Sequence, residues 1–542
     1  MAADARSIES RVDAIFAEWA RSDSPGCALG VYRDGQLIYA RGYGMANLEL
    51  GIGITPQSVF DIGSTSKQFT AFSIMLLAKD GKLSLDDDIR KYVPEIPNYG
   101  KTVTIRHLLH HTSGIRDYCD LLAFSGFRDE DIATDNDALQ ILSRQKALNF
   151  QPGGEFLYSN SGYFLLSLVV KRVSGLSLRD FAQKWIFGPL GMCHTQYNDR
   201  HTRIIPNRAT GYSSVGGDFA ISMSDWEQTG DGAVLTSVED LLLWDRNFYD
   251  SKVGGADVIA QMLTPGKLDN GEFLEYAAGL FIREHRGLKT VSHGGGWAGY
   301  RAELLRFPEQ KLSVACLCNN GSLNPSNLAM KVAEVYLGEQ MKPESPAQVT
   351  GPAPEVSVPA SELEKKVGAY LNAKAGSIWR LTIEEGKLLA TGPNRQFLLV
   401  PTAPDTFRVD DVSITITFVT SAAGKRPQMR AMVADEKEPR VFEPIDLWVP
   451  TPAQLSGMSG NYRSDELGTT LTLMQKEGTL LLKYRIFGDE PVSLIPALKD
   501  SFLLGGVTLT FTRGARERID GFYLDSGRIK GIRFTKLPAA GI

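Results

Sequence analysis

A hydroxyl and an amine lie three residues apart in Phe60-Asp61-Ile62-Gly63-Ser64-Thr65-Ser66-Lys67-Gln68-Phe69. An apolar run with few helix breakers follows and stops at Gly81, so we expect a helix that begins at Ser64. Residues i and i+3 share a helix face, so the side chains of Ser64 and Lys67 are expected to touch. A serine hydroxyl is a weak nucleophile until a nearby base accepts its proton, and a desolvated lysine helps in this. The pair therefore predicts a nucleophilic serine at a helix N-terminus.

This spacing has a second interpretation. Serine and lysine are common residues, and the same pattern arises by chance in long chains. A serine that caps a helix, followed by a solvated lysine in the first turn, would look the same. Residues elsewhere in the chain must decide between the two.

Length and charge limit the classes of function. The chain has 542 residues, which is too long for a single core and predicts two or three domains. Hydrophobic residues make up 43% and charged residues 22%, as in ordinary globular proteins. Lys and Arg number 58 against 63 Asp and Glu, a net charge of −5 that argues against nucleic-acid and anionic-membrane partners. No apolar stretch is long enough to span a bilayer.

The N-terminus and the cysteines bear on localisation. Residues 1–11 contain no apolar segment, so we expect no signal peptide and a cytoplasmic location for the chain as given. A signal removed earlier would instead indicate a secreted or periplasmic protein. The five cysteines are odd in number and scattered, which does not suggest a disulfide framework. We expect Cys316 and Cys318 to be buried thiols on one face of a strand, and we favour a reducing compartment.

The sequence indicates no metal site and no cofactor. Its seven histidines occur without cysteines at zinc-ligand spacing. His107, His110 and His111 cluster in a short predicted helix that ends at Gly114. Because no carboxylate stands at ligand spacing beside them, we favour packing and capping roles over metal binding.

The order of elements predicts an α/β fold. We expect a helix over residues 7–20 and a hairpin over 26–44 that turns at Asp34-Gly35. A capping box formed by Ser237 and Asp240 predicts another helix. Antiparallel strands with helices before and after them give a sheet flanked by helices, over a catalytic domain of residues 1–340. Its other expected strands and helices lie at 163–170, 288–297, 312–318 and 326–337.

The texture of the chain changes after residue 340. Five prolines in residues 341–360 predict an extended linker. Gly368-Ala369-Tyr370 recurs 92 residues later as Gly460-Asn461-Tyr462, and Glu385-Gly386 recurs at the same offset as Glu477-Gly478. The repeat predicts two related antiparallel β-barrel domains, and closed barrels would leave no exposed strand edges. They span residues 361–449 and 450–542.

Two further motifs follow the Ser64 pair in sequence order, Tyr158-Ser159-Asn160 and His293-Gly294-Gly295. The three together resemble the active-site set of the serine β-lactamase and penicillin-binding protein superfamily. Their wording is most similar to the class C-like peptidase family, which includes D-aminopeptidases and DD-carboxypeptidases. The resemblance covers residues 8–338, and three motifs in order make it far more specific than the Ser64 pair alone.

The resemblance implies a role for each motif residue. Ser64 corresponds to the acylated nucleophile, and Lys67 would share its proton and set the electrostatics of the site. Tyr158 corresponds to the general base or proton shuttle, since a nearby ammonium can stabilise a phenolate. Asn160 would donate a hydrogen bond to the acyl-side amide of the substrate.

The third motif departs from the β-lactamases. His293 stands where they carry a lysine, so the resemblance counts it among the catalytic residues, but a histidine is mostly neutral at pH 7. We therefore expect weak binding of β-lactams and of terminal carboxylates, as in D-aminopeptidases. The oxyanion hole would be formed by the backbone N–H groups of Ser64 and Gly296, with Gly295 beside it as a substrate-binding position.

The two-barrel tail also resembles D-aminopeptidases, whose last barrel sends a loop into the cleft. Here Phe502 to Leu509 passes through only Gly505-Gly506, so the long intruding loop is expected to be missing. Substrate size and stereochemistry stay open at this point.

Three functions follow from these residues. The first is a serine hydrolase that acts on small amides or peptides, of the D-aminopeptidase or D-amino-acid amidase kind. The second is a carboxylesterase, and the third is a penicillin-binding or sensor module with little turnover. No Gly-x-Ser-x-Gly elbow occurs, so an α/β-hydrolase would lack its nucleophile. The expected partner is a small-molecule amide, peptide or ester, and a homodimer is among the open oligomeric states.

Overall fold

A six-stranded antiparallel sheet forms the centre of residues 7–342. The predicted turn at Asp34-Gly35 joins its last two strands, and both turn residues have positive φ (51° and 72°), as a tight hairpin requires. In spatial order the strands are β10 (Phe281–His285), β11 (Leu288–Trp297), β12 (Tyr300–Phe307), β13 (Leu312–Cys318), β1 (Cys27–Arg33) and β2 (Gln36–Tyr43).

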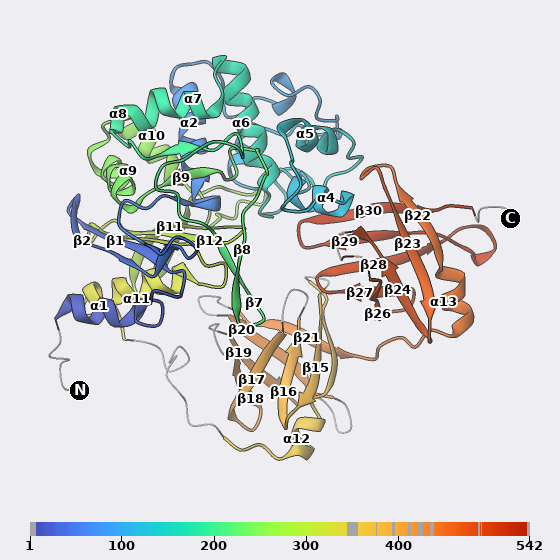
Figure 1. The fold of residues 1–542 in the computed structure, drawn as a ribbon. Helices are drawn as coiled ribbons and strands as arrows, with labels where there is room; N and C mark the ends of the chain where they lie inside the picture. The colour runs from blue at the N-terminus through green and yellow to red at the C-terminus, as the bar shows by residue number, and fades with distance from the viewer. Residues whose placement is uncertain are drawn as a thin grey trace. The chain divides into compact units, whose positions relative to one another are not determined.

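Helices cover both faces of the sheet, as predicted (Figure 1). α1 (Ile8–Phe16) and α11 (Pro325–Leu337) lie on one face, where their apolar side chains form one core cluster with those of β1 and β13. The helices on the other face are α2 (Lys67–Lys79), α6 (Asn160–Ser174), α7 (Leu178–Ala182), α9 (Val238–Asp250) and α10 (Gly255–Met262). The segment between α2 and α6 adds α3 (Ile105–Leu109), α4 (Tyr118–Ser125) and α5 (Asp135–Ser143).

A buried polar network ties α2 to α9 and β12. Arg306 Nε donates to Asp245 Oδ1 at 2.7 Å, and both side chains are 2% exposed. Gln68 Oε1 accepts from Trp244 Nε1 at 3.0 Å and from Arg306 Nη1 at 3.3 Å. Ser313 Oγ also donates to Asp245 Oδ1 at 2.8 Å, whereas Arg306 Nη2 is buried without a hydrogen-bond partner among the described residues. Because Gln68 directly follows Lys67, the network fixes the start of α2.

One cysteine expectation is wrong. Cys318 is not a free thiol, because it forms a disulfide with Cys27, its register partner on the neighbouring strand. The two cysteines are 291 residues apart in sequence, and only the pairing of β1 with β13 brings them together. Cys316 is a buried free thiol, as expected. The bond removes the premise from which a reducing compartment was inferred.

The computed structural model describes residues 7–343, 356–374, 377–392, 396–409, 414–420, 426–433, 438–485, 488 and 490–538. Contacts within the chain divide it into two units, Met1–Lys342 and Pro343–Ile542. Most of the predicted linker, residues 344–355, lies outside the described residues.

The first repeat of the second unit is a closed eight-stranded barrel, as predicted. The helix α12 (Ala360–Glu364) precedes it, and Leu363 joins its core. Its strands are β14 (Gly368–Asn372), β15 (Ser377–Glu384), β16 (Lys387–Thr391), β17 (Gln396–Ala403), β18 (Thr406–Val409), β19 (Ile414–Val419), β20 (Gln428–Val433) and β21 (Arg440–Ile445).

The second repeat is a nine-stranded sheet that is nearly closed, preceded by α13 (Pro452–Met458). Its two end strands are separated in the chain by Leu494 alone. Gly505-Gly506 forms the expected tight turn. In spatial order the strands are β25 (Val492–Ser493), β24 (Thr479–Lys483), β23 (Thr469–Lys476), β22 (Gly460–Ser464), β30 (Ile529–Lys536), β29 (Ile519–Ser526), β28 (Val507–Arg513), β27 (Ser501–Leu504) and β26 (Ile495–Pro496).

The repeat extends to individual hydrogen bonds. Tyr370 Oη donates to the carbonyl of Lys366 at 2.8 Å, and Tyr462 Oη donates to the carbonyl of Met458 at 2.5 Å. In both repeats this hydrogen bond ties the first strand to the helical segment before it.

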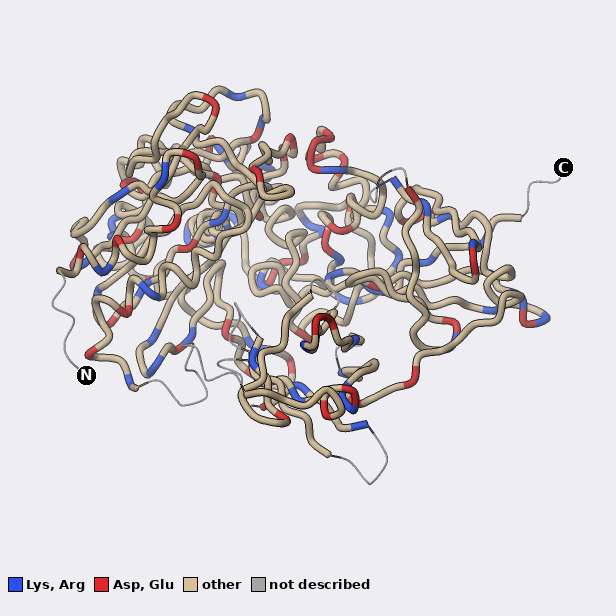
Figure 2. Tube along the Cα trace, turned by 60° about the horizontal axis from the view of Figure 1, so that its bottom comes forward, with Lys and Arg blue, Asp and Glu red and all other residues tan. Residues whose placement is uncertain are grey.

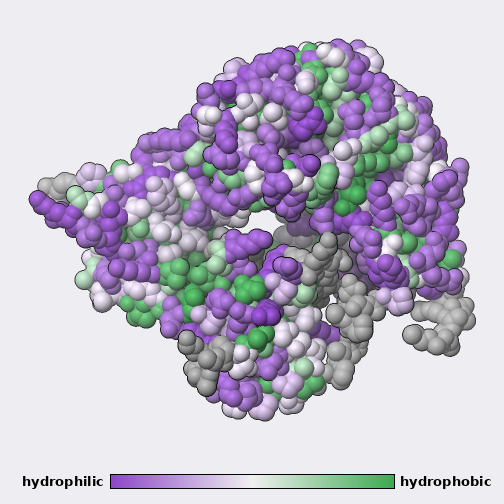
Figure 3. All heavy atoms as spheres, turned by 180° about the vertical axis from the view of Figure 1, so that it is seen from behind, coloured by the Kyte–Doolittle hydropathy of each residue, from purple (hydrophilic) through white to green (hydrophobic). Residues whose placement is uncertain are grey.

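Charged residues of both signs are spread along the described chain. Figure 2 shows Lys and Arg interspersed with Asp and Glu along the described trace. Hydrophilic residues cover most of the face in Figure 3, with apolar residues scattered among them. Within the described residues, every helix is too short or too polar to cross a bilayer.

Candidate active site

Ser64 lies at the junction of a short strand and a helix. The strand β5 (Phe60–Asp61) pairs with β9 (Val234–Thr236) and is followed by the 3₁₀ turn η1 (Gly63–Ser66). The α-helix begins at Lys67 and not at Ser64 as expected. Gly63 has a φ of +47°, and its N–H donates to Asp61 Oδ1 at 2.7 Å. This tight turn fixes Ser64 at the head of α2.

Lys67 is buried beneath Ser64 and has three hydrogen-bond partners. Its Nζ donates to Ser64 Oγ at 2.9 Å, to Asn160 Oδ1 at 2.9 Å and to the carbonyl of Asp231 at 2.6 Å. The predicted contact between the serine and the lysine is therefore present. Three acceptors satisfy all three N–H groups of an ammonium.

Asn160 is the first residue of α6, and its backbone is bonded to the N-cap residue of α4. Its backbone N–H donates to Asp117 Oδ2 at 2.6 Å, and Asp117 also caps α4 by accepting from the N–H of Cys119 at 3.0 Å. Asn160 Nδ2 contacts Cys119 Sγ at 3.6 Å. With its Oδ1 on Lys67, the amide of Asn160 has a fixed orientation.

The ring of Tyr158 lies beside the ammonium of Lys67. Lys67 Nζ is 4.9 Å from the centroid of the Tyr158 ring and 5.6 Å from that of Tyr163. The Tyr158 ring lies 4.2 Å from that of His111, between centroids. A cation beside an aromatic face is stabilised by the ring quadrupole, and burial strengthens this.

His293 lies behind the site. It is 3% exposed, and its Nε2 lies 3.1 Å from Tyr276 Oη while its Nδ1 lies 2.6 Å from the carbonyl of Gly294. Burial, with a smaller contribution from the charge of Lys67, lowers the pKa of His293 to about 3. His293 is therefore neutral at pH 7 and supplies no charge for a substrate carboxylate.

The strand β11 runs directly against η1. Thr65 Oγ1 donates to the carbonyl of His293 at 2.9 Å. A Cβ atom on Gly295 would lie 1.8 Å from the carbonyl oxygen of Ile62 and 3.1 Å from the backbone nitrogen of Ser64. Gly296, one residue further, is exposed. The strand positions of Gly295 and Gly296 thus lie beside the Ser64 turn, where the sequence places the oxyanion hole.

Asp231 and its partner Tyr118 belong to the site but lie in no sequence motif. Asp231 contributes a backbone carbonyl to Lys67, and its carboxylate accepts from Tyr118 Oη at 3.1 Å. Burial raises the pKa of Asp231 to about 6, although the nearby Lys67 opposes this. A backbone acceptor can belong to any residue type, so only the pairing of β5 with β9 reveals this position.

The clustered histidines have structural roles. His107 Nδ1 accepts from the N–H of Thr104 in the capping box of α3, and His111 Nδ1 accepts from the N–H of Ser159. Burial lowers the pKa of His110 to about 4. Among the described residues, the one group of side chains spaced closely enough for a metal is Cys27, Cys316 and Cys318, and two of these form the disulfide.

Comparison with known proteins agrees with this geometry. The chain is 29% identical to a penicillin-binding protein of Bacillus subtilis (strain 168), over 71% of this chain and 88% of that protein. It is 27% identical to a D-aminopeptidase of Gluconobacter oxydans (strain 621H), over 92% of this chain and 91% of that protein. An octameric penicillin-binding protein homologue from Pyrococcus abyssi has a similar structure, with a TM-score of 0.59, 26% identity and coverage of 80% of this chain and 99% of that one.

The family model described as Beta-lactamase matches residues 12–337. This range is more than half of the chain and contains Ser64, Lys67, Tyr158, Asn160 and His293. By this match, the chain belongs to the Beta-lactamase family.

Proposed function

We propose that this protein is a serine hydrolase that cleaves small amides or peptides next to a D-amino acid, through an acyl-enzyme on Ser64. The observation that carries the proposal is the position of Lys67 Nζ, which donates at once to Ser64 Oγ, Asn160 Oδ1 and the Asp231 carbonyl. An ammonium held in this way polarises the serine but cannot accept its proton. The role of base then falls to Tyr158, whose ring lies beside that ammonium.

The reaction has two halves. In the first, Ser64 Oγ bonds to the substrate carbonyl carbon while its proton passes to Tyr158; the C–N bond then breaks and the amine leaves with that proton. In the second, water attacks the acyl-enzyme ester and gives one proton to Tyr158; the C–O bond to Ser64 then breaks, that proton passes to Ser64 Oγ and the acid is released. The N–H groups of Ser64 and Gly296 would stabilise the oxyanion in both halves.

The substrate class follows from charge and from the relatives. A neutral His293 offers no cation for the carboxylate of a penicillin or of a peptide C-terminus. Arg301 Nη1 lies near Gly296 but donates to the carbonyls of Ala298 and Tyr300. Similarity to a D-aminopeptidase over 92% of the chain, both units included, favours D-aminoacyl substrates.

A substrate panel with a nucleophile variant tests the proposal. A fluorophosphonate should add mass to the peptide that contains Ser64, and D-aminoacyl amides should be hydrolysed faster than L-aminoacyl amides or a chromogenic β-lactam. Ser64→Ala should lower kcat by several orders of magnitude. Ser73→Ala is the matched control, because it removes a hydroxyl of the same helix, one that donates to the carbonyl of Phe69 at 2.8 Å and lies outside the Ser64 network. Full activity in Ser64→Ala would overturn the proposal, and a preference for p-nitrophenyl esters would favour the carboxylesterase.

We also propose a role for each part of the chain. Residues 1–340 are the catalytic domain, 341–360 a linker, and 361–449 and 450–542 two barrel domains that restrict access to the site. The division of contacts at Lys342 supports this assignment. Self-association, at least to a homodimer, is included because a structural relative is octameric, and sedimentation equilibrium would measure it.

A further inference from the structure

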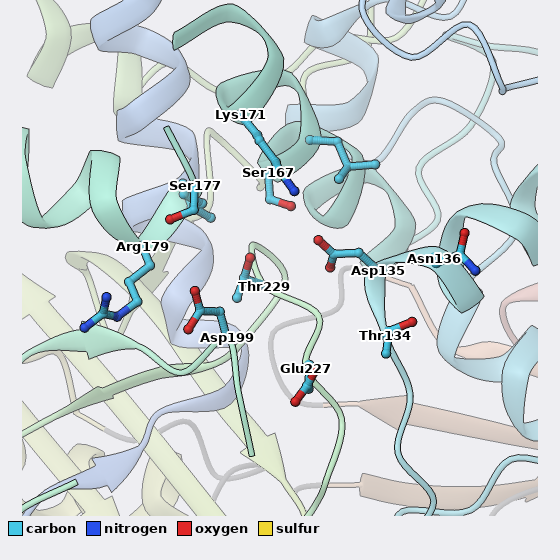
Figure 4. A pocket seen from close by; sticks show the side chains of 12 residues that line it. Thr134, Asp135, Asn136, Ser167, Lys171, Ser177, Arg179, Asp199, Glu227 and Thr229 are labelled. Atoms are coloured by element: carbon cyan, nitrogen blue, oxygen red, sulfur yellow. The ribbon is translucent and has the colours of Figure 1, made fainter. Parts of the chain in front are cut away.

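Outside the Ser64 site, a cavity lies beside the second half of α6, whereas Asn160 is at the start of that helix. It has a volume of about 300 Å³, is open to solvent, and is lined by the start of α5, the second half of α6, the start of α7 and the segments around residues 199 and 227–229 (Figure 4). Five charged side chains line it: Asp135, Lys171, Arg179, Asp199 and Glu227. A cavity of this volume is at the lower end of the range for small-molecule sites.

Two of these charges, Asp135 and Lys171, are opposite in sign and unpaired. Among the described residues, neither makes a hydrogen bond or an ion pair within 4.0 Å, and in Figure 4 both side chains point toward the cavity. Burial raises the pKa of the Asp135 carboxyl, Lys171 opposes this rise, and Asp199 and Glu227 add to it. A half-buried carboxylate without a hydrogen-bond donor is costly, so a ligand that donates there would be favoured.

The other charges are held in place by neighbours outside the cavity. Asp199 Oδ1 accepts from Arg203 Nη2 at 2.6 Å, and Glu227 Oε1 lies 2.8 Å from His201 Nδ1. Arg179 makes longer contacts, from Nη1 to Asp180 Oδ1 at 3.3 Å and from Nη2 to Gln196 Oε1 at 3.5 Å. These fixed charges create a potential of both signs within one small volume.

A ligand of a single charge would satisfy only part of this lining. An anion would meet Lys171 but face three carboxylates, and a simple cation would meet Asp135 but leave Lys171 unpaired. A zwitterion satisfies both. We propose that this cavity is a binding site for a free α-amino acid, with its ammonium on Asp135 and its carboxylate on Lys171, beside the apolar side chains of Leu168 and Leu178. The proposal does not depend on which bond Ser64 cleaves.

Binding to the full-length chain tests this, after a fluorophosphonate has filled Ser64. The probes are D-alanine and L-alanine, with propionate and ethylamine as the two halves of the zwitterion. Ligand-observed NMR should detect an alanine with a Kd below about 10 mM, while each half binds at least tenfold more weakly. Asp135→Asn and Lys171→Gln should each weaken alanine binding at least tenfold.

Two matched variants control for charge in general. Lys184→Gln and Asp257→Asn remove the same charges from exposed positions outside the cavity and should leave alanine binding unchanged. Asp135→Asn changes the first residue of α5 and could affect folding. Lys171 is exposed, so Lys171→Gln should keep the fold and leave the test valid. Alanine binding that is undetectable, equal for the half-ligands or unaffected by both cavity variants would overturn the proposal. Failure of Ser64 to react would count against the proposed function alone, since the cavity variants are compared without it.

Discussion

Lys67 is completely buried, and each of the three N–H groups of its ammonium has a hydrogen-bond acceptor. Asn160 Oδ1 and the carbonyl of Asp231 can only accept hydrogen bonds, so two of its three N–H groups are committed away from the nucleophile. The third reaches Ser64 Oγ. An ammonium bound in this way has no lone pair to accept a proton and acts through its charge, which separates its role from that of the base.

The first prediction at this scale concerns Tyr158. Tyr158→Phe keeps the ring beside Lys67 but removes the hydroxyl that would take the serine proton. We expect kcat to fall by about 10²–10⁴-fold with little change in KM, because a transition-state role is lost. Tyr163→Phe is the matched control, since that hydroxyl donates to the carbonyl of Leu109 and its ring also lies near Lys67. An unchanged kcat in Tyr158→Phe would exclude Tyr158 as the base.

The second prediction uses the lowered pKa of His293. The folded state protonates His293 only near pH 3, whereas the ordinary value is 6.5. Between these values the unfolded chain binds the additional proton, so this residue makes stability fall as the pH drops below about 6.5. His293→Gln should remove about 2 kcal/mol of the loss between pH 7.5 and pH 5, measured by urea unfolding. An identical pH dependence in His293→Gln would show that His293 titrates normally.

At the scale of elements, the site depends on how closely β11 approaches the turn η1. No side chain fits at Gly295, because its Cβ would overlap the carbonyl oxygen of Ile62. We predict that Gly295→Ala destabilises the protein by about 1–3 kcal/mol, as overpacking does elsewhere. It should also slow acylation of Ser64 by roughly 10²-fold, because the strand and the nucleophile move apart.

Thermal unfolding and the rate of fluorophosphonate labelling would measure both effects. Gly53→Ala is the matched control, since Gly53 lies in an exposed strand with no atom within 4 Å of its added Cβ. Equal labelling rates in the two variants would mean that the approach of β11 does not position Ser64.

Local elements could be predicted from the sequence where one short motif determines the backbone. The hairpin at Asp34-Gly35 and the cap of α9, where Ser237 Oγ accepts from the N–H of Asp240, are of this kind. Ser64 and Lys67 meet because four residues of one helical segment suffice. The 3₁₀ start of that segment was not predicted, because it depends on the hydrogen bond between Gly63 and Asp61.

Long-range pairings could not be predicted in this way. Cys27 meets Cys318, and Asp231 reaches Lys67, only after strands far apart in sequence have paired. In the second unit, the repeat predicted related strands, but only the structure distinguishes a closed barrel from a nine-stranded sheet that stops short of closure.

At the scale of the whole molecule, chemistry and repeat belong to different units. Ser64, Lys67, Tyr158 and Asn160 all lie within Met1–Lys342, and their hydrogen-bond partners given above do too. This unit has its own sheet and its own core cluster. It therefore has what a domain needs to fold alone.

The last prediction follows from that division. A chain that ends at Lys342 should stay folded and hydrolyse a small p-nitrophenyl ester with a kcat/KM within about tenfold of the full chain, because no residue of the site is removed. Its preference between a D-aminoacyl amide and a longer peptide should relax if the barrels restrict access. Measuring both substrates on both chains separates the two effects, with circular dichroism as the check on folding. A truncated protein that is folded but inactive toward the ester would place part of the catalytic site in the second unit. An insoluble one would show that residues 343–542 cover apolar surface that the first unit cannot expose to water.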